Sequence, residues 1–332
     1  MPGDLSFEQL LVQLQDPDWR IRRRAIEDLG ELRDQRAFDV LVAALADAEV
    51  QVRHSATAAL GQLSDPRVFD HLLSQLQEQD NYVAASVLGG RGDARAAPAL
   101  IQKIAKAVEA GPSRSAADDA MCLRAVESVV MLKDRAAIDV LLRLAKDKAY
   151  FMREAAAKAL GQMGDSRALP VLLALSGDSH RQVRRAAARA LGKLNNPQAL
   201  EPLLVMLNED DDDLACAAAE ALGELGDRRA VQPLIDRVRK MSSGSARRFA
   251  AIAVGKLRDD RALAPLLEAL KDKEPDVRCG AAEGLGYLGD AAALPHLESA
   301  KLHDEGFWDL GSVRDFAQEA IERIHGTPPS KG

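Results

Sequence analysis

One glycine recurs through the sequence at nearly constant spacing. It stands at eight places: Gly30, Gly61, Gly89, Gly161, Gly192, Gly223, Gly255 and Gly286. Val130 occupies the one remaining place, and most of the steps are 31 residues long. A period of this length indicates a solenoid of stacked supersecondary units, because one such unit cannot bury its apolar face alone. The glycine therefore restricts nearly the whole chain to a repeat architecture.

Each period contains two apolar stripes with helical spacing. Around Gly192 the first stripe runs from Val183 to Leu194 and the second from Leu200 to Leu207, each with apolar residues three and four apart. The chain opens with a stripe of the second kind, so a repeat is best divided into an A helix (L-x-x-L-L) followed by a B helix (V-R-x-x-A-A). The sequence predicts an all-α fold, a single α-solenoid over residues 1–332 with about ten bihelical repeats.

The repeat resembles a known one. Its pattern, D-x(4)-V-R-x-x-A-A-x-A-L-G-x-L-G-D-x-R-A-x-x-x-L-L, is similar to the short HEAT-like repeat named after phycobilin lyases, and the resemblance covers nearly the whole chain. It implies a HEAT-like solenoid. It implies no single function, because such repeats occur in scaffolds, chromophore lyases and enzyme appendages alike.

The regular pattern breaks in two places. Near 87–117 the third B helix ends in three glycines within four residues, and the following A helix is overlong, which predicts a joint between repeats one to three and repeats four to ten. Close to the other end, the Phe307-Trp308 pair either covers the last helix or forms an exposed contact. The tail, 326–332, has two prolines and no apolar residue, and we expect it to be frayed.

Charged residues also recur. Numbered from the glycine, an aspartate at −14 lies in the A–B turn and an arginine at −8 lies in the first turn of the B helix. We expect neighbouring repeats to stack these residues into a structural ladder of ion pairs and helix caps. The arginines are Arg22, Arg53, Arg153, Arg184 and Arg278, and the aspartates are Asp16, Asp47, Asp147, Asp178 and Asp272.

Composition and motifs argue against several classes of function. A net charge of −7 argues against a protein that coats nucleic acid or an anionic membrane, and no apolar run is long enough to cross a bilayer. The three cysteines are far apart, as in reduced cytosolic chains, so we expect a cytoplasmic protein. Phosphate-binding, nucleophile-elbow and zinc-protease motifs are absent from the sequence, so we predict no catalytic residue, no metal site and no cofactor.

The remaining candidate is a surface of the B helices, which we call the B-helix stripe: positions −11, −10, −7, −6, −3 and +1 of each repeat. By resemblance to HEAT-type solenoids, it lines the concave groove. In the nine repeats that have the glycine or Val130 as reference, the stripe makes up 54 of 332 residues but holds six of the twelve aromatic residues. Aromatic and arginine side chains dominate binding hot spots. The predicted partner-binding residues are Trp19, Arg23, Tyr82, Tyr150, Phe151, Arg181, Arg185, Arg189, Phe249 and Tyr287.

Three functions fit these observations. The favoured one is a non-enzymatic scaffold or adaptor that binds a partner protein along the groove. The first alternative, implied by the resemblance, is a phycobilin-lyase-type subunit that holds a bilin chromophore. The second is a nucleic-acid binder of the DNA-repair HEAT-like kind, which the basic patches at Arg20–Arg24 and Arg181–Lys193 encourage. The stripe as a whole is neutral, which disfavours nucleic acid. The sequence names no partner.

Overall fold

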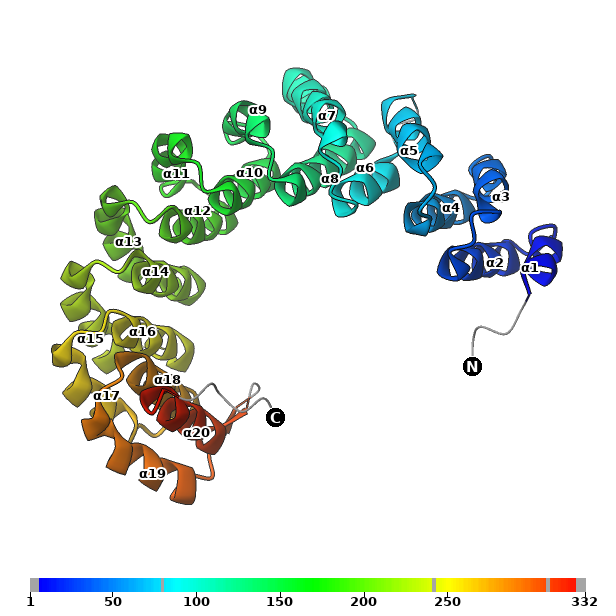
Figure 1. Ribbon diagram of the computed structural model, residues 1–332. Helices are drawn as coiled ribbons and strands as arrows, with labels where there is room; N and C mark the ends of the chain where they lie inside the picture. Colours follow the sequence, from blue (N-terminus) through cyan, green and yellow to red (C-terminus); the bar gives the residue numbers. More distant parts are fainter. Residues whose placement is uncertain (1–5, 79–80, 241–242, 309–310, 327–332) are drawn as a thin grey trace. The chain divides into compact units, whose positions relative to one another are not determined.

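The computed structural model describes residues 6–78, 81–240, 243–308 and 311–326 (Figure 1). Twenty α-helices lie in this part of the chain, and they alternate between the two kinds that the sequence predicts. The A helices are α1 (Phe7–Gln13), α3 (Ala37–Ala44), α5 (Arg67–Glu78), α7 (Ala97–Ala110), α9 (Ile138–Leu144), α11 (Leu169–Leu175), α13 (Leu200–Leu207), α15 (Val231–Arg239), α17 (Leu263–Ala269) and α19 (Leu294–His303).

Each A helix is followed by its B helix. The B helices are α2 (Trp19–Leu32), α4 (Val50–Gln62), α6 (Tyr82–Gly90), α8 (Ala116–Leu132), α10 (Tyr150–Met163), α12 (Arg181–Leu194), α14 (Asp212–Leu225), α16 (Gly244–Lys256), α18 (Pro275–Leu288) and α20 (Val313–Ile324). Ten A–B pairs result. The predicted fold class, an all-α solenoid of ten bihelical repeats, is confirmed.

Short elements connect these helices. A two-stranded antiparallel hairpin, β1 (Phe307–Trp308) with β2 (Gly311–Ser312), precedes α20. Seven 3₁₀ turns lead into A helices and one, η2, follows α7; they are η1 (Ala94–Ala96), η2 (Gly111–Ser113), η3 (Arg135–Ala137), η4 (Ser166–Ala168), η5 (Pro197–Ala199), η6 (Arg228–Ala230), η7 (Asp260–Ala262) and η8 (Ala291–Ala293). The turn before η6 shows how they start: the Asp227 carboxylate accepts from the backbone N–H of Arg229 at 2.9 Å.

The chain forms two compact units, unit 1 (Met1–Ala159) and unit 2 (Leu160–Gly332). Within each unit the A helices make one row and the B helices another, and the B row lies on the inner side of the unit's curve (Figure 1). Solenoid curvature arises when one row of helices packs more closely than the other.

The repeated glycine explains this close packing. A Cβ atom on Gly30 would lie 2.8 Å from the Cβ of Ala59 on the next B helix, and one on Gly192 would lie 2.7 Å from the Cα of Ala221. Side chains do not approach so closely, so a residue larger than glycine would push neighbouring B helices apart. The glycine that sets the sequence period thus sets the spacing of the B row.

The sequence predicts irregular segments near 87–117, at Phe307-Trp308 and in the tail. Helix α7, with 14 residues, is the longest of the A helices. The predicted joint near 87–117 stays a prediction. Of the tail expected to be frayed, residues 327–332 lie outside the described part of the chain, and so do the side chains of Phe307 and Trp308.

Candidate protein-binding surface

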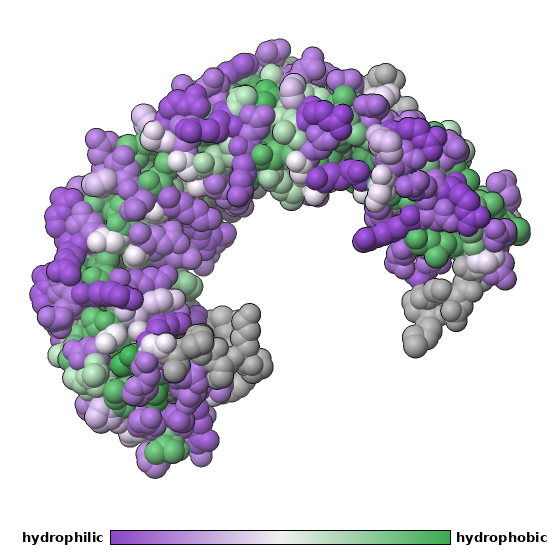
Figure 2. Space-filling model, in the orientation of Figure 1, coloured by the Kyte–Doolittle hydropathy of each residue, from purple (hydrophilic) through white to green (hydrophobic). Residues whose placement is uncertain are grey.

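The stripe residues differ in how far they are exposed. Tyr82 and Tyr150 expose 37% and 39% of their surface, whereas Trp19, Phe151 and the two aromatic residues of unit 2 are half-buried. In both units most of the face seen in Figure 2 is hydrophilic, with hydrophobic residues showing between the helices. Among the aromatic side chains whose burial the structure describes, Tyr82 and Tyr150 are the exposed ones.

In unit 1 the first stripe aromatic lies beside two arginines. The guanidinium carbons of Arg20 and Arg23 are 4.9 and 5.7 Å from the ring centroid of Trp19, within the range of a cation–π interaction. Arg23 also forms an ion pair with Glu27 one helical turn further on, at 3.4 Å. The start of α2 thus presents an aromatic ring together with positive charge.

The next aromatic residues of unit 1 contact aromatic neighbours. The Tyr82 hydroxyl lies 3.2 Å from Nδ1 of His54, and their rings meet edge to face with centroids 4.9 Å apart. Burial, together with the nearby charge of Arg53, lowers the pKa of His54 below its ordinary value, which favours the neutral imidazole. The rings of Tyr150 and Phe151 also meet edge to face, 5.8 Å apart. These contacts fix rings that remain partly exposed.

In unit 2 the predicted basic residues contact acids. Arg185 on α12 lies 3.1 Å from the Asp213 carboxylate on α14, and Arg189 lies 3.3 Å from Glu220. Arg181 is exposed at the start of α12. Two arginines of the basic patch Arg181–Lys193 are thus paired with carboxylates of the neighbouring helix α14.

The other two aromatic residues of the stripe in unit 2 lie close to cations. The Phe249 centroid is 5.6 Å from the guanidinium of Arg248, and Arg248 itself is buried. Lys256 and Arg323 lie 5.3 and 4.2 Å from the Tyr287 ring centroid. These rings are packed among their own neighbours, and less of their surface is open than for Tyr82 and Tyr150.

Below the stripe, the repeated charges connect successive repeats. Nε of Arg22 donates to the Asp47 carboxylate at 2.8 Å, and Nη1 donates to the backbone carbonyl of Asp16 at 2.8 Å. The hydrogen bond from Arg22 holds the pKa of Asp47 below its ordinary value. One arginine thus joins its own A–B turn to the turn of the next repeat.

The other ladder arginines bond their own turns in the same way. Arg53 and Arg153 donate to the carbonyls of Asp47 and Asp147 at 2.7 and 2.8 Å. Arg184 and Arg278 donate to the carbonyls of Asp178 and Asp272 at 3.0 and 2.8 Å. Their contacts with the following repeat vary: Arg184 lies 3.5 Å from Glu209, Arg278 lies 2.6 Å from Asp304, and the Asp272 carboxylate pairs with Arg247.

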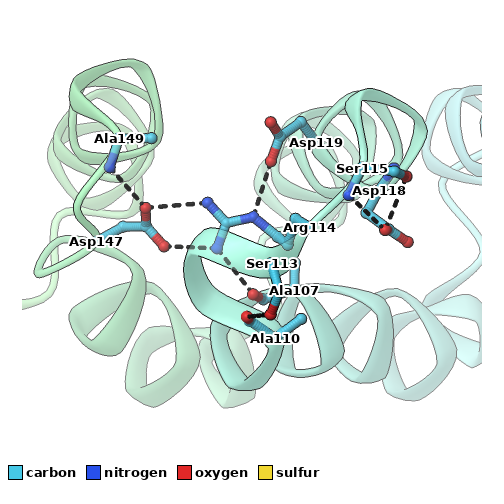
Figure 3. A network of polar contacts seen from close by, with 9 residues as sticks. All are labelled: Ala107, Ala110, Ser113, Arg114, Ser115, Asp118, Asp119, Asp147 and Ala149. Carbon is cyan, nitrogen blue, oxygen red and sulfur yellow. Dashed lines mark hydrogen bonds and ion pairs between the residues drawn. The ribbon is translucent and has the colours of Figure 1, made fainter.

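A residue that the sequence did not single out connects the fourth repeat to the fifth. This repeat has Cys122 at the −8 position, and Arg114, in the turn before α8, donates to both Asp147 oxygens at 2.7 and 3.0 Å (Figure 3). It also donates to Asp119 at 2.8 Å and to the carbonyl of Ala107 at 2.8 Å. The missing arginine at −8 was the only sequence signal that could have pointed to this replacement.

Comparison with known families agrees with this geometry. The sequence matches the family of HEAT repeats over residues 7–88, 113–191, 172–248 and 232–309, which is most of the chain. The protein belongs to the HEAT repeat family. The finer resemblance, to the short repeat of phycobilin lyases, is not established by this match. A search of curated proteins gives no match.

Solved HEAT-type solenoids share the fold. Importin beta is 13% identical with a TM-score of 0.67, over 95% of this chain and 52% of that chain. Kap121p bound to Pho4p is 12% identical with a TM-score of 0.58, over 96% and 45%. This HEAT repeat protein spans about half the length of either. The CpcE–CpcF complex of phycocyanin lyase from Nostoc is 23% identical over 80% of this chain and 93% of that chain, but its TM-score is only 0.36.

Two further properties concern the described part of this HEAT repeat protein. None of its helices combines the length and the hydropathy needed to cross a membrane. Within the same residues, no three His, Cys, Asp or Glu side chains gather in a way that could hold a metal ion. Burial raises the pKa of Cys122 to about 12 and that of Cys279 to about 11, so these thiols are neutral at physiological pH.

Proposed function

We propose that this HEAT repeat protein is a non-enzymatic scaffold that binds another protein along its B-helix stripe. The observation that carries the proposal is the exposure of aromatic and apolar side chains on the B row, above all Tyr82 and Tyr150. Partly exposed rings that are held in place lose little conformational freedom on binding, and tyrosine is enriched among hot-spot residues. Kap121p, which shares the fold, was solved bound to another protein, Pho4p. The cytoplasmic location is part of this proposal and rests on the sequence.

The ion pairs of unit 2 disfavour the nucleic-acid alternative. A nucleic-acid surface needs cations that are available to phosphates. Arg185 and Arg189 already contact Asp213 and Glu220, so a phosphate would have to compete with carboxylates that are fixed beside them. A bilin remains an alternative ligand on the resemblance alone, and an absorbance scan after co-expression with a bilin supply tests it.

Affinity capture with the full chain tests the scaffold proposal. The bait is compared with a variant that carries Tyr82→Ala and Tyr150→Ala, and the captured proteins are quantified by mass spectrometry. We expect a protein retained by the wild type to bind the variant about 30-fold or more weakly, because loss of a hot-spot ring costs about 2 kcal/mol.

The matched control is Val205→Ala. Val205 is a largely exposed apolar residue on the A helix α13, outside the stripe. Circular dichroism confirms that the variants are folded. Equal capture by the wild type, by the stripe variant and by a variant of the unit 2 stripe, Arg185→Glu, would overturn the proposal and move attention to the A-helix face.

A further inference from the structure

The B helices of unit 1 share a feature at their first residue. Four of the five begin with an aromatic or apolar side chain: Trp19 on α2, Val50 on α4, Tyr82 on α6 and Tyr150 on α10. Val50 is 40% exposed, close to the values for the two tyrosines, and Trp19 is half-buried. Trp19, Val50 and Tyr150 stand at −11, and Tyr82 stands at −7, one helical turn further along its helix, where it contacts His54 of α4. We call these side chains the apolar line.

The exception continues the same line. Helix α8 begins further upstream, at Ala116, so that its −7 position falls one turn or more inside the helix. That position is Leu123, which is half-buried and occupies the place that Tyr82 holds in the preceding repeat. Each of the five helices therefore contributes one apolar or aromatic side chain at −11 or −7.

The B helices of unit 2 begin differently. Four of them start with Arg181, Asp212, Gly244 and Pro275, and the fifth, α20, starts with Val313, which is fully buried. The −7 positions of unit 2 include Arg185, which pairs with Asp213, and Arg248, which is buried beside Asp276 at 3.5 Å. An apolar ligand placed here would have to remove the partly exposed Arg185–Asp213 pair from water, which costs free energy.

Side chains around the apolar line are mostly uncharged on α4 and α6, whereas α8 and α10 carry the ion pairs Arg124–Glu127 and Lys158–Glu154. On α4 the stripe holds Gln51, His54 and Ser55, and Ser55 donates to Glu27 of α2 at 3.2 Å. On α6 it includes Ser86, which donates to the carbonyl of Tyr82. Three arginines of the stripe gather at the start of α2, where 70% of the Arg20 side chain is exposed beside Trp19; Arg20 lies 3.7 Å from Asp18, which is itself nearly half exposed.

We propose that unit 1 binds an extended segment of another protein along this line. The segment carries an apolar or aromatic residue at about every third position, few charges over α4 and α6, and an acidic residue over Arg20. The spacing follows because packed helices are about 8–10 Å apart and an extended chain advances about 3.3 Å per residue. The acidic residue complements the arginines of α2. This inference rests on the proposed function and specifies its partner.

Selection from a displayed library of random 16-residue peptides, with the full chain as target, tests the inference. We expect the selected peptides to share apolar or aromatic residues about three positions apart, with an acidic residue near one end. Fluorescence anisotropy of the best peptide should show at least tenfold weaker binding to Tyr82→Ala and to Tyr150→Ala. Tyr82→Phe, which keeps the ring, should retain most of the affinity.

Matched variants locate the peptide. Val205→Ala changes an exposed apolar side chain outside the stripe, and Arg185→Glu changes the stripe of unit 2; neither should weaken binding more than twofold. Arg20→Glu should weaken binding and lessen its salt dependence.

Two outcomes separate this inference from the proposed function. In the first outcome, the selected peptides are rich in charge, Arg185→Glu weakens their binding and Tyr82→Ala does not. This would overturn the inference while leaving a scaffold that binds through unit 2. A library that yields no binder on the folded chain, together with unchanged capture by variants of both units, would overturn both.

Discussion

Arg114 and Asp147 form a bidentate pair between the A–B turns of the fourth and fifth repeats, with Nη–Oδ distances of 2.7 and 3.0 Å. Both side chains are buried, at 4% and 7% exposure. Burial alone raises the pKa of Asp147, but hydrogen bonds from Arg114 and from the Ala149 amide outweigh it, and the pKa lies below the ordinary value. Arg114, which lies in a turn, thus joins two successive A–B turns, as Arg22 does from the first turn of its B helix.

Replacement of Arg114 should lower the free energy of unfolding, and a second substitution should restore part of it. Arg114→Ala leaves Asp147 buried without its main partner, and we expect a loss of about 3 kcal/mol in the free energy of unfolding, measured by urea denaturation. Cys122→Arg in the same chain restores an arginine at −8, and we expect it to recover part of the loss. The control is Arg124→Ala, at an exposed site on α8, the helix that also carries Cys122; it should change the free energy of unfolding by less than about 0.5 kcal/mol. A double variant less stable than Arg114→Ala would refute the equivalence of the two positions.

Acid should weaken the ladder. Because the folded-state pKa of Asp47 is depressed, its carboxylate contributes stability above the unfolded-state pKa of about 3.9, and the contribution disappears as pH falls through the folded-state pKa. We therefore expect the stability difference between the wild type and Asp47→Asn to be largest above pH 5 and to shrink toward pH 3. Thermal denaturation across this range measures it. A difference independent of pH would show that the ion pair is not its source.

Two glycines on B helices should respond oppositely to alanine. A Cβ on Gly284 would lie 2.4 Å from the backbone oxygen of Ala251 on α16, so we expect Gly284→Ala to destabilise unit 2 by about 2–3 kcal/mol. Nothing lies within 4 Å of a Cβ on Gly90, the last residue of α6, and Gly90→Ala should stabilise by up to about 1 kcal/mol. Urea denaturation of both variants gives the comparison. Equal effects would contradict the role assigned to close packing.

The predicted joint near 87–117 can be tested by hydrogen exchange. The glycines at the end of α6 and the absence of an arginine at −8 in that repeat, where Asn81 stands, should allow local opening. We expect the amides of Tyr82–Asp93 to exchange faster than those of Ala186–Leu194. Ser128 opposes this effect, because its hydroxyl donates to the Ala85 carbonyl at 2.8 Å and ties α8 to α6. Ser128→Ala should therefore increase the difference in exchange rate between the two segments. Equal protection of the two segments in the wild type would contradict the predicted joint.

The sequence by itself determined the repeat, the order of its helices and the spacing of the B row. These follow from local periodicity and from Gly192 and its equivalents, whose lack of a side chain dictates how closely the next helix packs. Only the tertiary structure decided which charges meet. Arg185 and Asp213 are 28 residues apart, and their contact depends on the register between two helices, which composition does not encode. The tertiary structure also decided how far each aromatic side chain is exposed. Tyr82 and Tyr287 both occupy stripe positions, yet neighbouring side chains cover more of Tyr287. Burial differs because it depends on the residues that other helices bring nearby.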